Sequence, residues 1–305
     1  MTKGNIVPFV AVLILSYNGK NLLDDSVQSY LDNNYDNSKV VVIDNGSTDG
    51  TQDYVTSKWQ NVTVLRSDVN LKYSGGFNIG LDYAFHTLNA DYVLISNNDV
   101  EADKEVIRSL VNTALNNINA GFITGKVFYY DKRDVFQTTG KKYDDFWWMG
   151  PNIGRGEQDV GQYDSERELE WCDDIFWLVS KELYFTTGGY DTEFDFQAED
   201  FDWQVRAKNS GFKIFFSPNA KIWHKESSTI GKISPMKAYY DARNSNIVHM
   251  KYRRKDQYLA VIKKRRNIYL KASVKYFLKG EFRLIIKTFQ GYLSSIKWGK
   301  KNGKL

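Results

Sequence analysis

The feature that most constrains the fold is a series of short, continuously apolar runs, each followed by a polar loop. The first, Val10–Leu15, is β-branched and aliphatic and ends at Ser16–Gly19. Such a run is typical of a strand buried on both faces. Similar runs at Lys39–Ile43, Val62–Leu65 and Tyr92–Ile95 are separated by helical patterns. We therefore predict an α/β fold with a mostly parallel sheet, helices on both faces, and ligands beyond the carboxyl ends of the strands.

The rest of the chain is less regular. Helices are predicted at residues 22–33, 75–86, 104–117 and 199–209, and further strands at 122–127, 175–179, 213–216 and 222–224. Residues 131–165 show no clear period. From Tyr239 onward the pattern is helical and basic.

Charge is distributed unevenly along the 305 residues. Residues 251–305 hold 17 Lys and Arg against Asp256 and Glu281, whereas the preceding residues hold 24 basic and 35 acidic side chains. A basic helical tail that carries apolar residues suits an anionic membrane surface. A solvated or oligomerising helical pair, and hence a homodimer, stays open. Nucleic acid is disfavoured as a partner, because no nucleic-acid motif accompanies the tail.

The single cysteine, Cys172, excludes an internal disulfide, and no apolar run is long enough to span a bilayer. Both features fit a reducing cytoplasm. Together with the basic tail, they predict a protein located at the inner face of the cell membrane.

Carboxylates follow the predicted strands or open a predicted helix. They are Asp44, Asp49, Asp99 and the pair Glu199–Asp200. A divalent ion such as Mg²⁺ or Mn²⁺ binds one or two carboxylates together with phosphate oxygens, so Asp99 is a candidate ligand beside a bound diphosphate. Strand-end capping is the alternative for Asp99, and stabilisation by the helix macrodipole is the alternative for the acidic pair.

Glycines open the predicted helix near Gly75–Gly80. They could let the backbone approach a phosphate or sugar at a helix N-terminus, although a plain turn is an equal alternative. The pattern is neither Gly-x-Gly-x-x-Gly nor a phosphate loop with lysine. Nicotinamide-dependent oxidoreductases and P-loop ATPases are therefore disfavoured.

Seven motifs, taken together, carry a family resemblance. They are Ser16–Asn18, Val42–Gly50, Tyr73–Gly80, Asn97–Asp99, Gly188–Asp191, Glu199–Trp203 and Tyr239–Asn244. In this order they resemble glycosyltransferase family 2, which has the GT-A fold, and especially its rhamnosyltransferase-like bacterial members. The resemblance implies an inverting transfer of sugar, with dTDP-L-rhamnose as donor, to a cell-surface polysaccharide or lipid-linked glycan. A UDP-hexose or UDP-galactofuranose transferase is the nearest alternative.

The resemblance also implies roles for individual residues. The residues implied to bind the nucleotide sugar are Ser16, Asn18, Asp44, Gly76, Asn78, Asn98 and Arg243. Asn97, Asp99 and His224 would bind the divalent metal. The family's Asp-x-Asp motif has Asn97 at its first position here, and a neutral amide is a weaker metal ligand than a carboxylate.

Asp200 is implied to be the general base for the acceptor hydroxyl, with Glu199 orienting it. An ordinary Asp is a weak base for a hydroxyl, so we expect the site to raise the Asp200 pKa or to align the reactants closely. Trp171, Asp173 and Asp174 are predicted to contact the acceptor. The aromatic residues Tyr143, Trp147, Trp148, Trp171 and Trp177 could form an acceptor platform, although core packing is the more frequent role of such rings and is expected first for Trp177.

These expectations divide the chain into a GT-A catalytic domain over residues 1–238 and a basic helical region over 239–305. Within the first, residues 1–103 form the nucleotide-binding half and 104–238 the acceptor-binding half. The missing first metal carboxylate favours a different class of protein, a catalytically silent carbohydrate-binding or scaffold protein. The intact Asp99 and Asp200 oppose that alternative.

Overall fold

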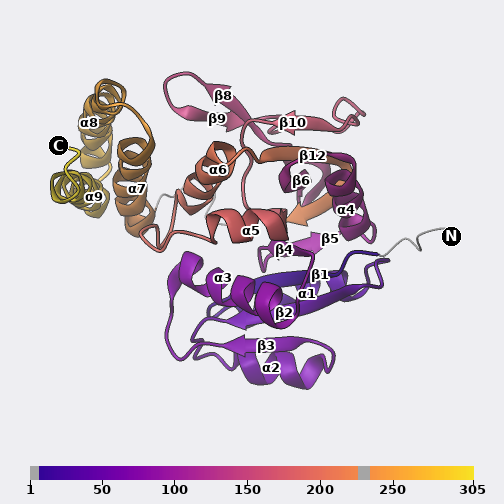
Figure 1. Cartoon of the computed structure of the whole chain (residues 1–305). Coiled ribbons are helices and arrows are strands. Elements are labelled where there is room, and N and C mark those ends of the chain that lie inside the picture. Colours follow the sequence, from indigo (N-terminus) through magenta and orange to yellow (C-terminus); the bar gives the residue numbers. More distant parts are fainter. Residues whose placement is uncertain (1–6, 226–233) are drawn as a thin grey trace.

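The computed structural model describes residues 7–225 and 234–305, and within them it contains a ten-stranded sheet, a two-stranded sheet and a C-terminal group of helices (Figure 1). The first half comprises β1 (Val10–Ser16), α1 (Leu23–Leu31), β2 (Ser38–Asp44), α2 (Thr51–Lys58), β3 (Thr63–Arg66), α3 (Lys72–Asp82), β4 (Tyr92–Ser96), β5 (Val100–Ala102) and α4 (Val106–Asn116). The next elements are β6 (Ala120–Tyr129), β7 (Lys132–Thr138), β8 (Lys141–Asp144), β9 (Trp148–Asn152), β10 (Arg167–Leu169), β11 (Phe176–Ser180), α5 (Lys181–Thr187), α6 (Glu199–Asn209) and β12 (Lys213–His224). The chain ends in α7 (Pro235–Tyr252), α8 (Lys255–Leu278) and α9 (Phe282–Lys301).

The large sheet has the strand order β10-β12-β6-β11-β4-β1-β2-β3. Strands β4, β1, β2 and β3 run parallel to one another, as their apolar runs predict. Strand β11 runs antiparallel to both β4 and β6, so the sheet is mixed at this point. Ser16 and Asp44 lie opposite each other where β1 and β2 end. The polar loops therefore gather at one edge of the sheet.

Apolar cores lie on both faces of the sheet, because successive side chains of a strand point to opposite faces. In β1, Val12 and Ile14 pack with residues of α1, α2 and α4. Ala11 and Leu13 pack with residues of α3, α5 and α6 on the other face. All four are fully buried, and the predicted mostly parallel sheet with helices on both faces is confirmed.

Strand β12 joins two strands that the sequence predicts separately. Its register shifts between Ser217 and Lys221, which accounts for the break in the apolar pattern. The last part of β12 pairs with the short strand β5, so that His224 lies opposite Val100. This pairing brings the residue before Val100, which is Asp99, next to His224.

Residues 131–165, for which the sequence gives no period, contain β7 and the β8–β9 hairpin. Strand β7 pairs with the end of β6, and the hairpin forms its own small sheet. Both pairings contain register shifts, and the hairpin is largely half-buried or exposed. Because the pairing is irregular and the hairpin has no consistently buried face, apolar and polar residues do not alternate in this part of the sequence.

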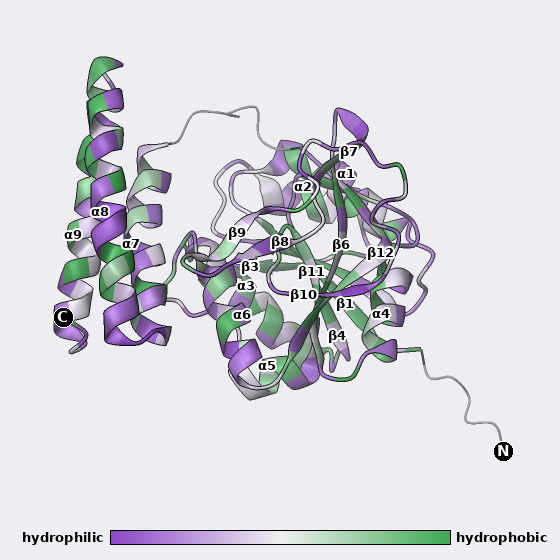
Figure 2. Cartoon of the chain, turned by 90° about the horizontal axis from the view of Figure 1, so that it is seen from above, coloured by the Kyte–Doolittle hydropathy of each residue, from purple (hydrophilic) through white to green (hydrophobic). Residues whose placement is uncertain are grey.

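The C-terminal helices pack side by side at one end of the molecule (Figures 1 and 2). Helix α7 begins at Pro235, where the Ser234 hydroxyl accepts a hydrogen bond from the Lys237 amide at 3.1 Å. A third apolar cluster, which includes Phe201, Val248 and Ile262, joins α6 to α7 and α8. Within the described part of the chain, no helix is both long and apolar enough to cross a membrane.

Candidate active site

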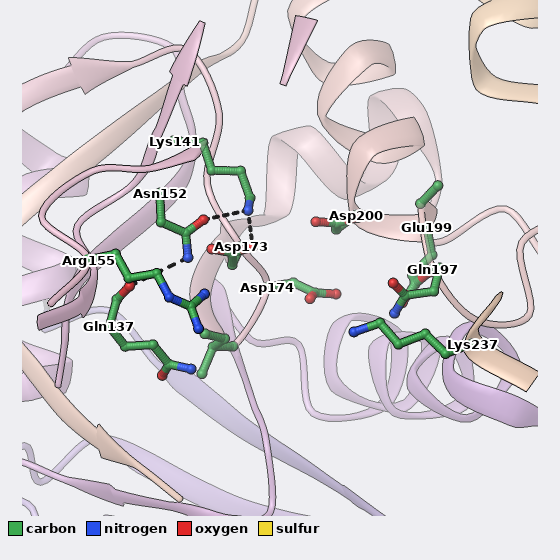
Figure 3. Close-up of a pocket in the computed structure, with 12 residues that line it drawn as sticks. Gln137, Lys141, Asn152, Arg155, Asp173, Asp174, Gln197, Glu199, Asp200 and Lys237 are labelled. Atoms are coloured by element: carbon green, nitrogen blue, oxygen red, sulfur yellow. Dashed lines mark hydrogen bonds and ion pairs between the residues drawn. The ribbon is translucent and has the colours of Figure 1, made fainter. Parts of the chain in front are cut away.

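A cavity of about 360 Å³ lies where the segment before β11, the start of α6 and the start of α7 meet (Figure 3). Its lining consists of Gln137, Lys141, Asn152, Arg155, Asp173, Asp174, Ile175, Gln197, Ala198, Glu199, Asp200 and Lys237. Four of these carry carboxyl groups, and we call the space the acidic cavity. The structure thus brings Glu199 and Asp200 together with Asp173 and Asp174, all four of which the sequence predicts as site residues.

The antiparallel strand β11 places two of these carboxyl groups at the edge of the sheet where β4 ends. Its first residue, Phe176, lies opposite Ser96, the last residue of β4. Asp173 and Asp174 precede β11 and therefore lie beside the loop that follows β4. The Asn97 amide donates a hydrogen bond to the carbonyl of Ile175 at 3.0 Å, which fixes the two segments against each other.

The start of α6 holds the other two carboxyl groups in place. Gln197 and Ala198 have φ angles of 68° and 72°, which are uncommon for residues other than glycine. The buried Asn244 side chain of α7 donates to the carbonyls of Phe196 and Gln197 at 2.9 Å each. These bonds hold the turn that delivers Glu199 and Asp200 to the cavity.

Gln204 connects the two acidic segments. Its side chain is fully buried, accepts from the Cys172 amide at 2.9 Å and donates to the carbonyls of Cys172 and Asp200 at 3.1 Å each. The geometry between Asp173 and Asp200 is therefore fixed by buried hydrogen bonds.

Burial and mutual repulsion perturb the carboxyl groups of the cavity. Burial raises the pKa of Asp174 to about 6, and the Tyr190 hydroxyl donates to its Oδ2 at 3.2 Å. Burial, with the charges of Asp174 and a neighbouring Asp, raises the pKa of both Glu199 and Asp200 well above the ordinary value. Perturbed carboxyl groups in a cavity are typical of catalytic sites.

Cationic side chains lie around the same carboxyl groups (Figure 3). The Lys141 ammonium forms an ion pair with Asp173 at 2.6 Å and donates to Asn152 at 2.7 Å. Arg155 and Lys237 also line the cavity. The cavity thus offers carboxylates for proton transfer beside cations that can hold an anionic leaving group.

Asp99 and His224 are in contact, as the pairing of β5 with β12 requires. His224 Nε2 lies 3.1 Å from Asp99 Oδ1, and His224 Nδ1 lies 2.8 Å from Oε1 of Gln137, which lines the acidic cavity. A histidine fixed through its second nitrogen is typical of metal sites. Within residues 7–225 and 234–305, no three His, Cys, Asp or Glu side chains gather as a metal site.

Three of the predicted nucleotide-binding residues lie at or just after the ends of β1 and β2, and two of them have protein partners. Asp44 is fully buried, forms an ion pair with Arg66 and accepts from the Ser47 amide at 2.9 Å. Asn18 accepts from the Thr48 amide at 2.8 Å. The Ser16 hydroxyl is buried and has no hydrogen-bond partner among the described residues. Asp44 and Asn18 therefore hold these loops together in this conformation.

Gly76 and Asn78 lie inside α3, because the helix begins at Lys72 and not at Gly75 as predicted. A Cβ on Gly76 would lie 2.5 Å from Leu15 Cδ1, so its absence lets α3 approach β1. The Asn78 side chain exchanges hydrogen bonds with the backbone of Tyr190 at 2.8 and 2.9 Å. The structure gives both residues packing roles.

Other predicted contacts lie outside the acidic cavity. Arg243 forms an ion pair with Glu193 and lines a separate hollow. Trp171 is 4% exposed and packs against Phe201, which matches the core alternative for this ring. Asn98 lies against the loop after β1, since its Nδ2 would be 2.7 Å from a Cβ on Gly19.

Two further spaces adjoin the acidic cavity. A hollow of about 330 Å³ beside the ends of β1 and β2 is mostly apolar and includes Tyr17, Phe196 and Tyr240. A groove of about 350 Å³ shares Lys141, Asp173, Gln197, Ala198 and Asp200 with the cavity and extends to Trp147 and Arg265. We call these the nucleoside hollow and the acceptor groove, after the roles that we propose for them.

Several cavity residues carried no recognisable signal in the sequence. Gln137, Lys141, Asn152 and Arg155 come from the segment without a period, and Lys237 comes from the first turn of α7. The available signal was compositional, because basic and amide residues recur in an aromatic segment that forms no regular amphipathic element.

The mixed sheet with helices on both faces and polar loops at one edge is the GT-A fold of solved glycosyltransferases. The chain matches the structure of GalNAc-T7 with UDP, GalNAc and Mn²⁺ with a TM-score of 0.58 and 15% identity, over 72% of this chain and 44% of that chain. It matches the mannosyltransferase PcManGT from Pyrobaculum calidifontis, in complex with GDP-Man and Mn²⁺, with a TM-score of 0.55 and 14% identity, over 96% and 88%.

The family model "Glycosyl transferase family 2" matches residues 11–163, and the chain belongs to this family. It is also similar to the N-acetylglucosaminyl-diphospho-decaprenol L-rhamnosyltransferase of Mycobacterium tuberculosis. The two are 25% identical over 210 residues, which cover 63% of this chain and 68% of the relative. The resemblance inferred from the seven motifs is therefore confirmed.

Proposed function

We propose that the protein transfers L-rhamnose, with inversion, from dTDP-L-rhamnose to a sugar hydroxyl of a lipid-linked glycan. The observation that carries the proposal is the acidic cavity, in which Asp200 has a raised pKa and lies among cationic side chains. The choice of donor and acceptor is supported by the similarity to the mycobacterial L-rhamnosyltransferase.

In the proposed mechanism, Asp200 accepts the proton of the acceptor hydroxyl as that oxygen attacks the anomeric carbon. The raised pKa makes this carboxylate a stronger base than an ordinary Asp. Glu199, which is 5% exposed and has one carboxyl oxygen without a partner in the described structure, orients the acceptor. Arg155 and Lys237 stabilise the departing nucleoside diphosphate.

The nucleoside is proposed to lie in the nucleoside hollow. Tyr17 is 49% exposed there, and an aromatic face can stack on a planar base. The hollow lies next to the acidic cavity, because Phe196 lines the hollow and the following residue, Gln197, lines the cavity. Under this proposal Asp44 and Asn18 shape the end of the hollow, and Ser16 offers an unpaired hydroxyl.

A divalent ion, Mg²⁺ or Mn²⁺, fits the contact between Asp99 and His224. A carboxylate and an imidazole, with Asn97 in the adjoining loop, form a donor set that such ions accept, and diphosphate oxygens complete it. When bound, the ion would neutralise charge that develops on the leaving diphosphate. Gln137 holds the second nitrogen of His224 and so orients the imidazole.

The donor can be tested by measuring hydrolysis across a panel of sugar nucleotides, with Mg²⁺, with Mn²⁺ and with EDTA. We expect dTDP-L-rhamnose to be hydrolysed fastest, and hydrolysis to fall when EDTA is present. A faster reaction with a UDP-hexose or with UDP-galactofuranose would replace the donor assignment. No hydrolysis or transfer with any donor would favour the catalytically silent alternative.

The catalytic base can be tested with Asp200→Asn. We expect transfer to fall roughly 10²- to 10⁴-fold, which is the usual contribution of a general base, while the dissociation constant of the donor stays within about twofold. The wild-type rate should rise with pH as the carboxyl group loses its proton. A variant that transfers sugar as fast as wild type would show that Asp200 is not the base.

We also propose that α8 and α9 dock the enzyme on an anionic membrane. The end of α8 and the start of α9 expose Val274, Phe277, Leu278 and Phe282, of which Leu278 is 79% exposed. We call these four residues the α8–α9 tip. Hydrophilic and hydrophobic residues are mixed along both helices (Figure 2). Basic side chains around an apolar patch complement an anionic lipid surface at the inner face of the membrane.

A further inference from the structure

The acceptor groove continues beyond the residues needed for proton transfer. Its lining includes Asp173 and Asp200, the side chains of Trp147 and Met149, and Arg265 on α8. An acceptor whose hydroxyl contacts Asp200 would therefore extend its remaining atoms toward α8. The chemistry at that end of the groove indicates what those atoms are.

The Arg265 end of the groove carries cations that lack carboxylate partners. Nε of Arg265 is buried and without a hydrogen-bond partner in the described residues, and its Nη1 contacts the Tyr269 hydroxyl at 3.3 Å. The guanidinium lies 5.0 Å from the centre of the Trp147 ring, and the adjacent Lys264 ammonium lies 4.2 Å from that of Phe146. Neither cation forms an ion pair with another described residue, so both can bind an anion.

A second arginine near Arg265 also has buried guanidinium nitrogens without hydrogen-bond partners. Nε and Nη2 of Arg253 are buried without partners in the part of the chain that the structure describes, and its guanidinium lies 4.3 Å from the Trp148 ring. A buried, unpaired guanidinium nitrogen is costly unless it binds water or an anion. Arginine presents a planar fork of donors that matches phosphate oxygens.

Asp241 is the carboxyl group on the α7 side of the groove. It forms no ion pair with Arg265 among the described residues, and burial raises its pKa, while the charges of Lys237 and Arg265 act in the opposite direction. The buried His249 contributes no positive charge, because burial lowers its pKa well below the ordinary value. Arg265 and Lys264 therefore set the charge at the α8 end.

Exposed apolar side chains follow Arg265 along α8, among basic and polar ones. Ile268 lies one turn further along α8 and is 45% exposed, and the α8–α9 tip follows at the end of the same helix. A molecule that leaves the groove past Arg265 thus meets first a cation and then exposed apolar side chains. This order matches a sugar, a phosphate group and a lipid chain.

We propose that Arg265, assisted by Lys264, binds the diphosphate that links the acceptor sugar to its lipid. The inference rests on the proposed function, because the diphosphate is part of the lipid-linked acceptor proposed there. It makes α8 a wall of the substrate site as well as a membrane-docking element. The specificity it confers is for a phosphorylated acceptor over an uncharged glycoside.

The test uses the full chain and geranyl diphosphate as the probe, with the donor site filled by a saturating nucleoside diphosphate. We expect Arg265→Gln to weaken binding of geranyl diphosphate roughly 10-fold or more, the effect of losing a charge-assisted hydrogen bond. Arg265→Lys, which keeps the charge but not the fork, should give a smaller loss. The matched control is Arg266→Gln, which removes the same charge from the exposed neighbour and should change binding less than about twofold.

Thermal melts of both Gln variants show whether each variant is folded at the temperature of the binding assay. In transfer assays, Arg265→Gln should raise KM for a short-chain glycosyl diphosphate acceptor and leave KM for the matching octyl glycoside within about twofold. Equal losses for Arg265→Gln and Arg266→Gln would overturn the proposal. The proposal would also be overturned if Arg265→Gln lost binding to phosphatidylglycerol vesicles but still bound geranyl diphosphate. The site would then bind a lipid headgroup. If no sugar nucleotide is used by the wild type, the proposed function fails, while geranyl diphosphate binding still reports on the subsite.

Discussion

At the scale of single residues, the acidic cavity holds carboxyl groups at a cost to stability. Asp174 has a pKa raised by burial from 3.8 to about 6. The folded protein therefore binds this proton more tightly than the unfolded chain does, and the stability of the fold decreases as the pH rises from about 4 to about 6. The shift corresponds to roughly 1–3 kcal/mol that is lost above this range.

We predict that Asp174→Asn is more stable than wild type at pH 8, by up to about 3 kcal/mol, and that the difference closes as the pH falls to 4. The amide oxygen can still accept from the Tyr190 hydroxyl. Urea unfolding at several pH values measures this effect. Asp202→Asn is the contrasting control, because the Asp202 carboxylate pairs with Arg206 and Lys251 and its loss should destabilise the protein. A lower stability of Asp174→Asn at pH 8 would contradict the cost assigned to this group.

Sequence motifs located the cavity residues Glu199 and Asp200, and the position of Asp173 and Asp174 beside Trp171 predicted the other two. The contact of Asp99 with His224 follows from strand pairing. The motifs could not separate a polar side chain that binds a ligand from one that holds a turn. Asn78 is an example, since its amide bridges α3 to Tyr190. Which hydrogen-bond partner a side chain finds is decided by the packing of distant segments.

At the scale of elements, the turn before α6 depends on α7. Asn244 is fully buried, and its two hydrogen bonds hold the carbonyls of Phe196 and Gln197. We predict that Asn244→Ala lowers the transfer rate about 10- to 100-fold, because a shift of about 1 Å in the α6 start would displace Asp200. Single-turnover kinetics measure this rate.

The matched control for this prediction is Asn246→Ala. Asn246 is also buried in α7, but it bonds to Ala242 and to Ser295 of α9 and not to the turn. Both variants should lose about 1–3 kcal/mol of stability. The transfer rate of correctly folded protein should fall in Asn244→Ala alone. A similar fall in both variants would mean that α7 acts through general packing.

The elements that the sequence predicts well are those with one dominant period. The strands near residues 10–15, 39–43 and 92–95 agree with β1, β2 and β4 to within a few residues, and α6 has the predicted bounds. The elements β5, α5 and β7 to β10 were missed. They are short or paired irregularly, and their positions depend on tertiary contacts and not on a local pattern.

At the scale of the whole molecule, the three spaces proposed for substrates lie between the ends of β1 and β2 and helix α8. The acceptor groove shares residues with the acidic cavity, and the nucleoside hollow is joined to the cavity by the neighbouring residues Phe196 and Gln197. The α8–α9 tip lies at the far end of α8. Docking at this tip would thus bring the open end of the groove toward the source of a lipid-linked acceptor.

We predict that the protein binds vesicles containing phosphatidylglycerol, that salt weakens this binding, and that phosphatidylcholine vesicles bind far less. Replacing both Phe277 and Leu278 with Ser should lower vesicle affinity at least about 10-fold, because each loses apolar burial in the bilayer interface. The control replaces Leu115 and Ile118, which are 60% and 86% exposed on the body of the protein, and should have no effect in a vesicle sedimentation assay. Two other results together would contradict membrane docking: the wild type binds neither vesicle type, and the Phe277 and Leu278 variant is a monomer where the wild type is a dimer. The α8–α9 tip would then join two copies of the chain and would not contact lipid.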